Sequence, residues 1–140
     1  LELSERLRGA CSAWAIVEVW PEIIDRVNIL EATRAAMRAA IRSVAEPGTV
    51  AVVDHVEPGE VGLPVFSFAK ADDRYFCVAA ASILAKVHRD RIMRDLAAAE
   101  DRWGWSRNVG YGTREHRIAI DRFGRSYLHR QSFRVARVLP

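Results

Sequence analysis

The stretch from Lys70 to Met93 constrains the fold more than any other, because a short acidic turn opens there into the longest helix-compatible segment of the chain. One apolar face is formed by residues at three- and four-residue spacing: Phe76, Ala80, Ile83, Leu84 and Val87. Beyond Arg89, if each residue turns the helix by about 100°, the apolar residues lie on nearly the opposite side of the helix. We therefore expect two different parts of the protein to bury this helix, or the helix to bend near Arg89.

Asp72 and Asp73 stand between this helix and the apolar segment Val65–Ala69. One interpretation places a carboxylate at the end of a strand, where open α/β sheets hold their ligands. The other is that an Asp side chain caps the exposed N–H groups of the helix that follows. The spacing by itself favours the cap.

The preceding segments predict an α/β protein. Ala13–Val19 alternates and is rich in β-formers, which predicts a strand. Asn28 followed by Glu31 predicts the capped start of a helix over residues 29–44. Thr49–Val53 is a short apolar run of the kind expected for a buried strand. Strand, helix and strand in this order predict a right-handed crossover with parallel strands.

Two carboxylates follow the later strands of this scheme. Asp54 directly follows Thr49–Val53, and Asp72 follows a further predicted strand over Pro64–Ala69. Because ligands collect beyond the carboxyl ends of such strands, the two Asp side chains suit Mg²⁺ or Mn²⁺, which prefer oxygen ligands. The alternative is that Asp54 only starts the loop His55–Leu63. Two carboxylates are also too few to hold a pair of metal ions well.

Gly110 and Gly112 flank Tyr111 in a tight segment that should expose the ring. Thr113 is placed to cap a helix that continues through Ile120. An exposed aromatic ring beside arginines is a stacking platform for a sugar or base. The motif alone favours the simpler alternative, a packed tyrosine in an ordinary turn.

Charge divides the 140 residues unevenly. Residues 102–140 carry nine Arg and two acidic side chains, a net +7, whereas residues 1–101 carry twelve basic and sixteen acidic side chains, a net −4. A basic end on an acidic body fits an enzyme that binds a polyanion and works on it with carboxylates. A solvated surface of salt bridges explains the charge equally well. We expect one domain, with an αβ core over about 1–101 and an Arg-rich helical region over about 102–140.

Cysteine usage and hydropathy point to a cytoplasmic protein. Cys11 and Cys77 lack metal-type spacing and stand in apolar company, as reduced core cysteines do. No apolar run is long enough to cross a bilayer. The basic end over residues 129–140 has interspersed apolar residues and is similar to a short docking tail.

Six segments, taken together and in this order, resemble ribonuclease HII, the type 2 ribonuclease H of bacteria. They are IDRVNILEATRAAMRAAI, AVVD, KAD, AAASILAKVHRDRIM, GYGTREH and HRQSF. Each is weak alone, but the ordered set is highly specific and covers most of the chain. The resemblance implies a ribonuclease H-like fold, in which helices flank a mixed sheet, with a C-terminal helical extension.

The resemblance also implies an activity: hydrolysis of the RNA strand of RNA–DNA hybrids and nicking at ribonucleotides embedded in duplex DNA. The family uses four carboxylates and Mg²⁺ or Mn²⁺. Asp54 in AVVD matches the third carboxylate and Asp72 in KAD the fourth, while Tyr111 in GYGT matches the tyrosine that packs against the sugar at the RNA-to-DNA junction. Three basic side chains are further candidates for phosphate contacts, although each could equally be a surface charge: Lys70, Lys86 and Arg89.

The chain departs from the family pattern in three places. The family's first two carboxylates, an adjacent Asp and Glu before a Gly-Arg-Gly loop, have no counterpart after Leu1. We therefore expect the C-terminal part of a longer, monomeric enzyme; alone, this part should bind metal weakly, lack activity and self-associate. The alternative is a non-catalytic hybrid-binding fragment or pseudo-enzyme. His55 replaces a usual Gly, and Asn108–Val109 replaces a usual His-Lys, which puts one phosphate contact in doubt.

Overall fold

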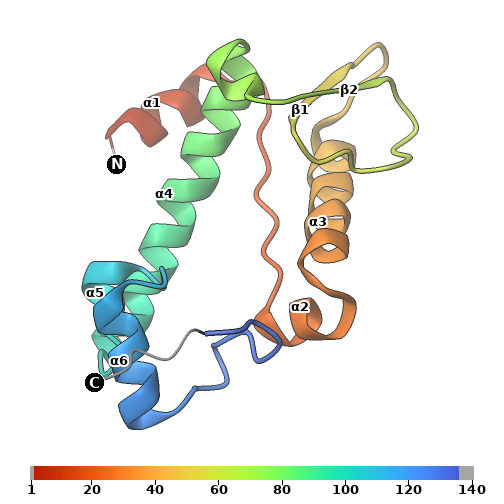
Figure 1. Cartoon of the computed structure of the whole chain (residues 1–140). Coiled ribbons are helices and arrows are strands. Elements are labelled where there is room, and N and C mark those ends of the chain that lie inside the picture. Colours follow the sequence, from red (N-terminus) through yellow and green to blue (C-terminus); the bar gives the residue numbers. More distant parts are fainter. Residues whose placement is uncertain (1, 136–140) are drawn as a thin grey trace. The chain divides into compact units, whose positions relative to one another are not determined.

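The structure is a computed structural model that describes residues 2–135. Within this range the chain forms six α-helices, one 3-10 helix and two strands, which confirms the α/β class (Figure 1). In chain order they are α1 (Glu2–Ala10), α2 (Pro21–Val27), α3 (Ile29–Val44), β1 (Ala51–Asp54), β2 (Val65–Phe68), η1 (Ala71–Asp73), α4 (Phe76–Ala99), α5 (Trp105–Asn108) and α6 (Arg114–Phe123).

The sheet consists of β1 and β2, which pair in parallel with Ala51 opposite Val65 and Asp54 opposite Phe68. The predicted crossover between residues 13–19 and β1 is wrong. Residues 13–19 lie in the described part of the chain but form no strand, and β1 pairs instead with β2, the next strand along the chain. Alternation reports which side chains are buried, but a strand also requires partners for its N–H and C=O groups. The mixed sheet expected from the resemblance is therefore represented here by one parallel pair.

The loop between β1 and β2 is held by a row of arginines on α3. They donate to successive main-chain carbonyls: Arg34 to Glu57 (3.3 Å), Arg38 to Pro58 (2.6 Å) and Arg42 to Glu60 (3.0 Å). Residues four apart lie on one face of a helix, so the row presents three guanidinium groups to the loop. Pro58 is fully buried beneath them. The predicted helix cap is confirmed, because Asn28 Oδ1 accepts the N–H of Glu31 at 3.1 Å.

Two different parts of the chain bury the two ends of α4, as its shifting apolar stripe predicted. The first part of α4 packs with α1 through Leu7, Ala80 and Leu84. The later part contributes Ala97 to a cluster with Trp103 and Trp105. The chain accordingly divides within α4 into two compact units, the first ending at Val87 and the second starting at His88.

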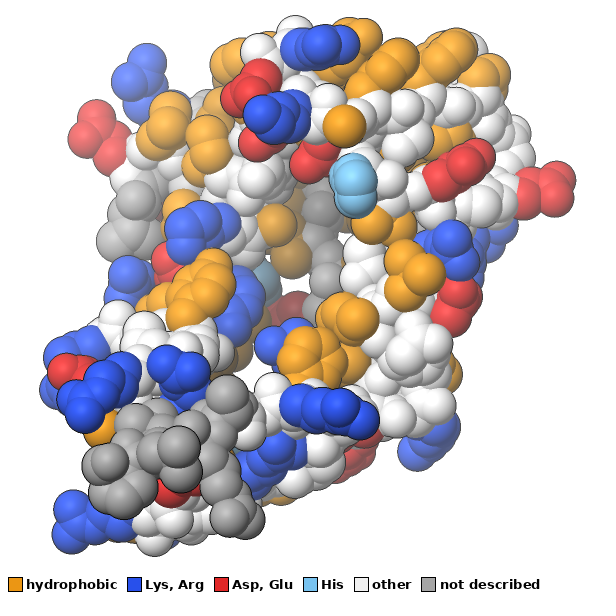
Figure 2. Space-filling view, in the orientation of Figure 1, with side chains coloured by type: hydrophobic (Ala, Val, Ile, Leu, Met, Phe, Trp, Pro, Cys, Tyr) orange, Lys and Arg blue, Asp and Glu red, His pale blue; other side chains and the backbone are white. Residues whose placement is uncertain are grey.

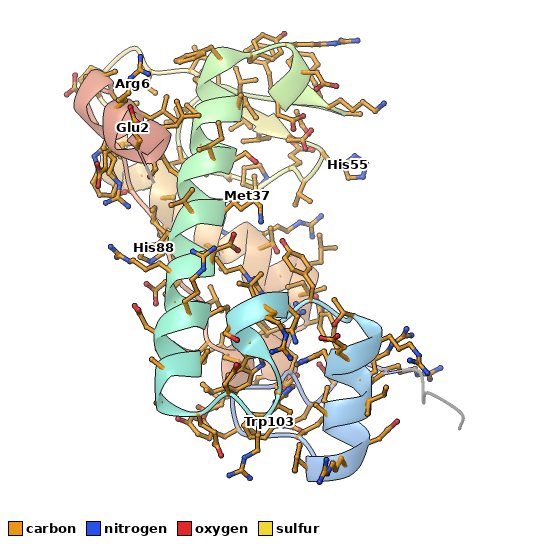
Figure 3. All side chains as sticks on the ribbon, turned by 90° about the vertical axis from the view of Figure 1, so that its left-hand side faces the viewer. Glu2, Arg6, Met37, His55, His88 and Trp103 are labelled. Carbon is orange, nitrogen blue, oxygen red and sulfur yellow. The ribbon has the colours of Figure 1, made fainter. Side chains whose placement is uncertain are left out.

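Aromatic side chains form the core of the second unit. Trp103 lies between the end of α4 and α6 (Figure 3) and donates its indole N–H to the carbonyl of Gly124 at 2.8 Å. Its ring centroid is 4.9 Å from that of Trp105. Thr113 caps α6 as predicted, since its Oγ1 accepts the N–H of His116 at 3.2 Å, although the helix extends beyond the predicted end to Phe123.

The predicted docking tail lies partly outside the described residues, which end at 135. In the described part, Arg125 donates to the carbonyls of Gln131 (2.5 Å) and Phe133 (2.6 Å). These bonds fold residues 126–133 into a turn. Cys11 and Cys77 are both free, and Cys77 is exposed, so the expectation of a core position was wrong for it. None of the described helices is long and apolar enough to cross a membrane.

Large apolar side chains are exposed on the first unit, among them Trp20 (55%), Phe66 (52%) and Phe76 (77%). Figure 2 shows hydrophobic side chains gathered over the two strands and the start of α4. Apolar patches of this kind are typical of surfaces that another polypeptide covers. Self-association of the chain, which the sequence led us to expect, stays a prediction.

Candidate active site

Asp54 closes β1 and is exposed, whereas its neighbour Val53 is buried. The strand continues to pair just past it, because the N–H of His55 donates to the carbonyl of Phe68 at 3.0 Å. One carboxylate oxygen of Asp54, Oδ1, accepts the N–H of Ala71 at 2.9 Å. This bond ties the end of the first strand to the start of η1.

Asp72 belongs to η1, so the prediction that it ends a strand was wrong: β2 stops at Phe68. The chain turns at Lys70, which has left-handed backbone angles (φ 56°, ψ 44°) and precedes a completely buried Ala71. Asp72 follows as an exposed residue. Because the N–H of Ala71 bonds to Asp54, the two Asp residues still come from neighbouring turns at one edge of the sheet.

The alternative role as a helix cap does not hold for Asp72 or Asp73. The helix α4 begins at Phe76, and the N–H groups of Val78 and Ala79 both donate to the carbonyl of Tyr75. The N-cap position is therefore Tyr75, two residues beyond Asp73. Both Asp side chains are exposed in η1.

The two carboxylates suit a hard divalent cation in donor type, because they offer oxygen atoms only. Asp54 keeps Oδ2 in addition to the oxygen that accepts from Ala71. Among the described residues, no three His, Cys, Asp or Glu side chains come together as a metal-binding group. Asp54 and Asp72 thus fit as part of a metal cage and do not form a complete one.

His55 follows Asp54 with a left-handed φ of 59°. Such a φ favours Gly, which is the residue that the resemblance led us to expect at this position. Its imidazole stands out from the loop, away from the ribbon (Figure 3), and the residue is exposed.

Tyr111 has an exposed ring, as the flanking glycines predicted: 54% of the residue is accessible. The guanidinium of Arg89 lies over this ring, with Cζ 5.2 Å from the ring centroid. Arg89 also donates to the carbonyl of Val109 at 2.6 Å. The simpler alternative of a packed tyrosine therefore does not hold.

The predicted site residues form two groups, one in each unit. Asp54, Lys70 and Asp72 belong to the strand ends of the first unit, where the backbone of Lys70 turns the chain toward Asp72. Arg89 and Tyr111 touch each other in the second unit. Lys86 is exposed on the part of α4 that belongs to the first unit.

Two residues that support these groups were missed at the level of sequence. Ala71 anchors the carboxylate of Asp54, and the signal for it is the small residue between Lys70 and Asp72 in the KAD motif. Asn108 is buried behind the Tyr111 loop. At the level of sequence it is only a departure from the pattern of the resemblance, with no role.

The pKa values of two side chains in the second unit, Asp101 and His129, are shifted from their ordinary values. Hydrogen bonds from Ser106 lower the pKa of Asp101 below its ordinary value. Burial, with smaller contributions from His116 and Arg125, lowers the pKa of His129 to about 4. His129 therefore stays neutral in the folded protein at physiological pH.

Comparison with known proteins identifies the family. The profile of the family described as Ribonuclease HII matches residues 15–136. A ribonuclease HII of Pelodictyon phaeoclathratiforme is 42% identical over 134 residues, which are 95% of this chain and 65% of the relative. For the ribonuclease HII of Chlorobium luteolum the values are 42% over 136 residues, 96% and 65%. For that of Novosphingobium aromaticivorans they are 41% over 143 residues, 94% and 72%.

The chain thus spans 65% of the length of the first two of these relatives. The match includes β1 with Asp54, η1 with Asp72 and the loop with Tyr111. The family profile and these relatives each match most of the chain. The chain belongs to the ribonuclease HII family.

Proposed function

We propose that the protein containing this chain is an endonuclease that hydrolyses the RNA strand of RNA–DNA hybrids and nicks at ribonucleotides embedded in duplex DNA. Membership of the ribonuclease HII family supports the reaction class. Because hybrids and embedded ribonucleotides arise when DNA is copied, the proposal includes a role in DNA replication and repair, and it places the protein in the cytoplasm. The intact protein would act as a monomer with a ribonuclease H-like mixed sheet.

The observation that carries this proposal is the hydrogen bond from the N–H of Ala71 to Asp54 Oδ1, 2.9 Å long. It joins the end of β1 to the start of η1, which supports the proposal that Asp54 and Asp72 offer carboxylate oxygens to one site. These two residues would hold Mg²⁺ or Mn²⁺ as part of the donor set. Bound divalent ions supply activation of the attacking water and stabilisation of the leaving 3′-oxygen.

The remaining residues would bind and orient the substrate. Tyr111 would stack on the sugar at the RNA-to-DNA junction, since its exposed ring offers an apolar face. Basic side chains would contact phosphates, and the candidates are Lys70, Lys86 and Arg89. Figure 2 shows Lys and Arg side chains gathered over α5 and α6, which is consistent with a polyanionic substrate.

The test is cleavage of a duplex with one embedded ribonucleotide by the intact protein and three Asn variants. Asp54→Asn and Asp72→Asn keep the side-chain shape but remove a negative ligand, so each should lower the rate by several orders of magnitude. Asp73→Asn is the matched control, since Asp73 is the adjacent exposed carboxylate of η1 and should be dispensable. Near-normal cleavage by Asp54→Asn or Asp72→Asn at saturating Mg²⁺ would refute the assignment. Hybrid binding without cleavage by the unmodified protein would favour the non-catalytic alternative.

A further inference from the structure

The main chain around Tyr111 is fixed by short hydrogen bonds within the second unit. The N–H of Tyr111 donates to the carbonyl of Asn108, and the carbonyl of Tyr111 accepts the N–H of Thr113, both at 2.8 Å. Val109 and Gly110 have left-handed φ values of 42° and 78°. These bonds set the direction in which the Tyr111 side chain leaves the backbone.

Asn108 connects this loop to the core. It is 6% exposed, and both ends of its side-chain amide are used. Nδ2 donates to the carbonyl of the buried Trp103 at 2.8 Å, and Oδ1 accepts the N–H of Gly110 at 2.8 Å. Asn108 thus supports the loop from inside the second unit.

Arg89 supports the same loop from the other side. Its Nη1 donates to the carbonyl of Val109 at 2.6 Å while its Cζ lies 5.2 Å from the centroid of the Tyr111 ring. A Cβ added to Gly110 would meet Arg89 Nη2 and the Met93 side chain at 3.1 Å each. The guanidinium thus fills the space between the Val109 carbonyl and the ring. A planar fork can donate a hydrogen bond and cover a ring at once, which a lysine ammonium does less well.

We propose that Arg89 is a positioning residue that holds the Tyr111 ring in its stacking orientation, and that it is not a phosphate contact. This inference rests on the proposed function, because it takes Tyr111 as the stacking group. It replaces our prediction for Arg89 with a specific one: Asn108 holds the main chain of the loop from inside, and Arg89 holds both the Val109 carbonyl and the ring. Removal of Arg89 should therefore affect cleavage only through the position of Tyr111.

The first test is a double-mutant cycle on the intact protein, with Arg89→Met, Tyr111→Ala and the double variant. Cleavage at an embedded ribonucleotide and affinity for the same duplex are measured at several salt concentrations. Arg89→Met should reduce both by about two- to fivefold, the usual worth of an exposed cation–π contact. In the Tyr111→Ala background it should cause no further loss, because the group it positions is gone. The salt dependence of binding should stay unchanged.

The opposite pattern would overturn the inference. If Arg89 contacts a phosphate, Arg89→Met lowers affinity by the same factor in both backgrounds, and the slope of log K against log salt becomes shallower by about 0.9. If Arg89→Met unfolds the protein, Arg89→Lys replaces it in the cycle. Lys keeps the positive charge but lacks the planar guanidinium, so Arg89→Lys should lower cleavage when Tyr111 is present and have no effect in the Tyr111→Ala background. Equal losses in both backgrounds for Arg89→Lys would count against positioning.

A second readout needs no nucleic acid and separates this inference from the proposed function. Amide hydrogen exchange of Gly110 and Tyr111 should accelerate in Arg89→Met, since the Val109 carbonyl loses its donor. Arg91→Met is the matched control, an exposed arginine on the same helix, and should leave both amides unchanged. If Tyr111→Ala alone does not affect cleavage, the proposed role of Tyr111 is wrong. The amide exchange rates of Gly110 and Tyr111 still show whether Arg89 holds the loop. Unchanged exchange in Arg89→Met would show that Arg89 does not hold the loop.

Discussion

The two groups of site residues are built in opposite ways. At the end of β1, the exposed carboxylate of Asp54 is held by one main-chain N–H, and Asp72 is exposed in a short 3-10 turn. Around Tyr111, by contrast, Asn108 and Arg89 hold the loop through side-chain hydrogen bonds and a ring contact. In the proposed function a bound cation would draw the two carboxylates into place, whereas the protein itself would have to position a stacking ring beforehand. The side-chain contacts that fix the main chain are therefore found around Tyr111, where no bound ion would do so.

The cores of the two units also differ, in the kind of side chain that they bury. The first unit buries small and aliphatic residues, Leu7, Ala80 and Leu84, whereas the second stacks Trp103 on Trp105. Aromatic side chains bury more area each and dominate packing energies. The second unit thus depends on two large side chains with many neighbours, so a single change at one of them should destabilise it most.

The largest effect we predict on stability is that of Trp103→Ala. Trp103 is 4% exposed and its indole N–H bonds to Gly124, so the change should destabilise the second unit by about 3–5 kcal/mol. The measurement is the free energy of unfolding in denaturant. Trp14→Ala is the control, because Trp14 is 43% exposed and its loss should cost much less. Equal costs for the two variants would contradict an aromatic core around Trp103.

Tyr111→Ala should weaken cleavage at an embedded ribonucleotide by ~1–3 kcal/mol, the usual worth of base or sugar stacking on an aromatic ring. Tyr111→Phe keeps the ring and should largely restore the rate. Because the Tyr111 side chain is exposed and its ring contacts Arg89, the Ala change should cost the fold only about 0.5–1 kcal/mol, and the Phe change less. If the Ala variant cleaves as fast as the unmodified enzyme, the ring has only a structural role.

His55→Gly tests the less supported strand end and should stabilise the first unit by about 0.5–1 kcal/mol. A left-handed φ costs a side-chain-bearing residue more than it costs Gly, and this gain exceeds the entropy lost by Gly. Thermal unfolding measures the shift. Glu60→Gly, in the same loop and without a positive φ, should destabilise instead. A destabilised His55→Gly variant would show that the imidazole contributes more than the backbone strain removes.

The smallest effect at neutral pH is expected from His129, whose pKa is lowered to about 4 in the fold. An unfolded histidine titrates near 6.5, so between these two values the unfolded chain binds more protons. Stability should therefore rise with pH through this window and be lost as the pH falls from 6.5 toward 4. His129→Asn can keep the acceptor for the N–H of Ser126 and should flatten this dependence. An unchanged pH profile in that variant would assign the acid sensitivity to other groups.

Local chemistry allowed much of the fold to be predicted. The cap at Asn28, the cap at Thr113 and the two-sided burial of α4 each depend on residues a few positions apart. The end of β1 at Asp54 was also predicted, since a short apolar run and an acidic residue mark it. Tyr111 was correctly expected to be exposed because glycines flank it.

Long-range pairing could not be predicted in the same way. Ala13–Val19 has the composition of a strand, but nothing within it specifies a partner. The left-handed turn at Lys70, which moves Asp72 out of β2, depends on Ala71 bonding to Asp54 far back in the chain. Charge counts likewise missed that Arg38 and Arg125 donate to main-chain carbonyls, so part of the basic surface supports the fold.

The central claim is that Asp54 and Asp72 share one metal site, and titration of Mn²⁺ into the ¹⁵N-labelled chain tests it most directly. Paramagnetic broadening should appear first at the amides of residues 53–55 and 71–73, and it should need millimolar Mn²⁺ because two carboxylates hold a cation weakly. Asp54→Asn or Asp72→Asn should each abolish the broadening in both segments, while Asp73→Asn should leave it intact. Broadening that begins elsewhere, or that survives in both Asp54→Asn and Asp72→Asn, would contradict the shared site.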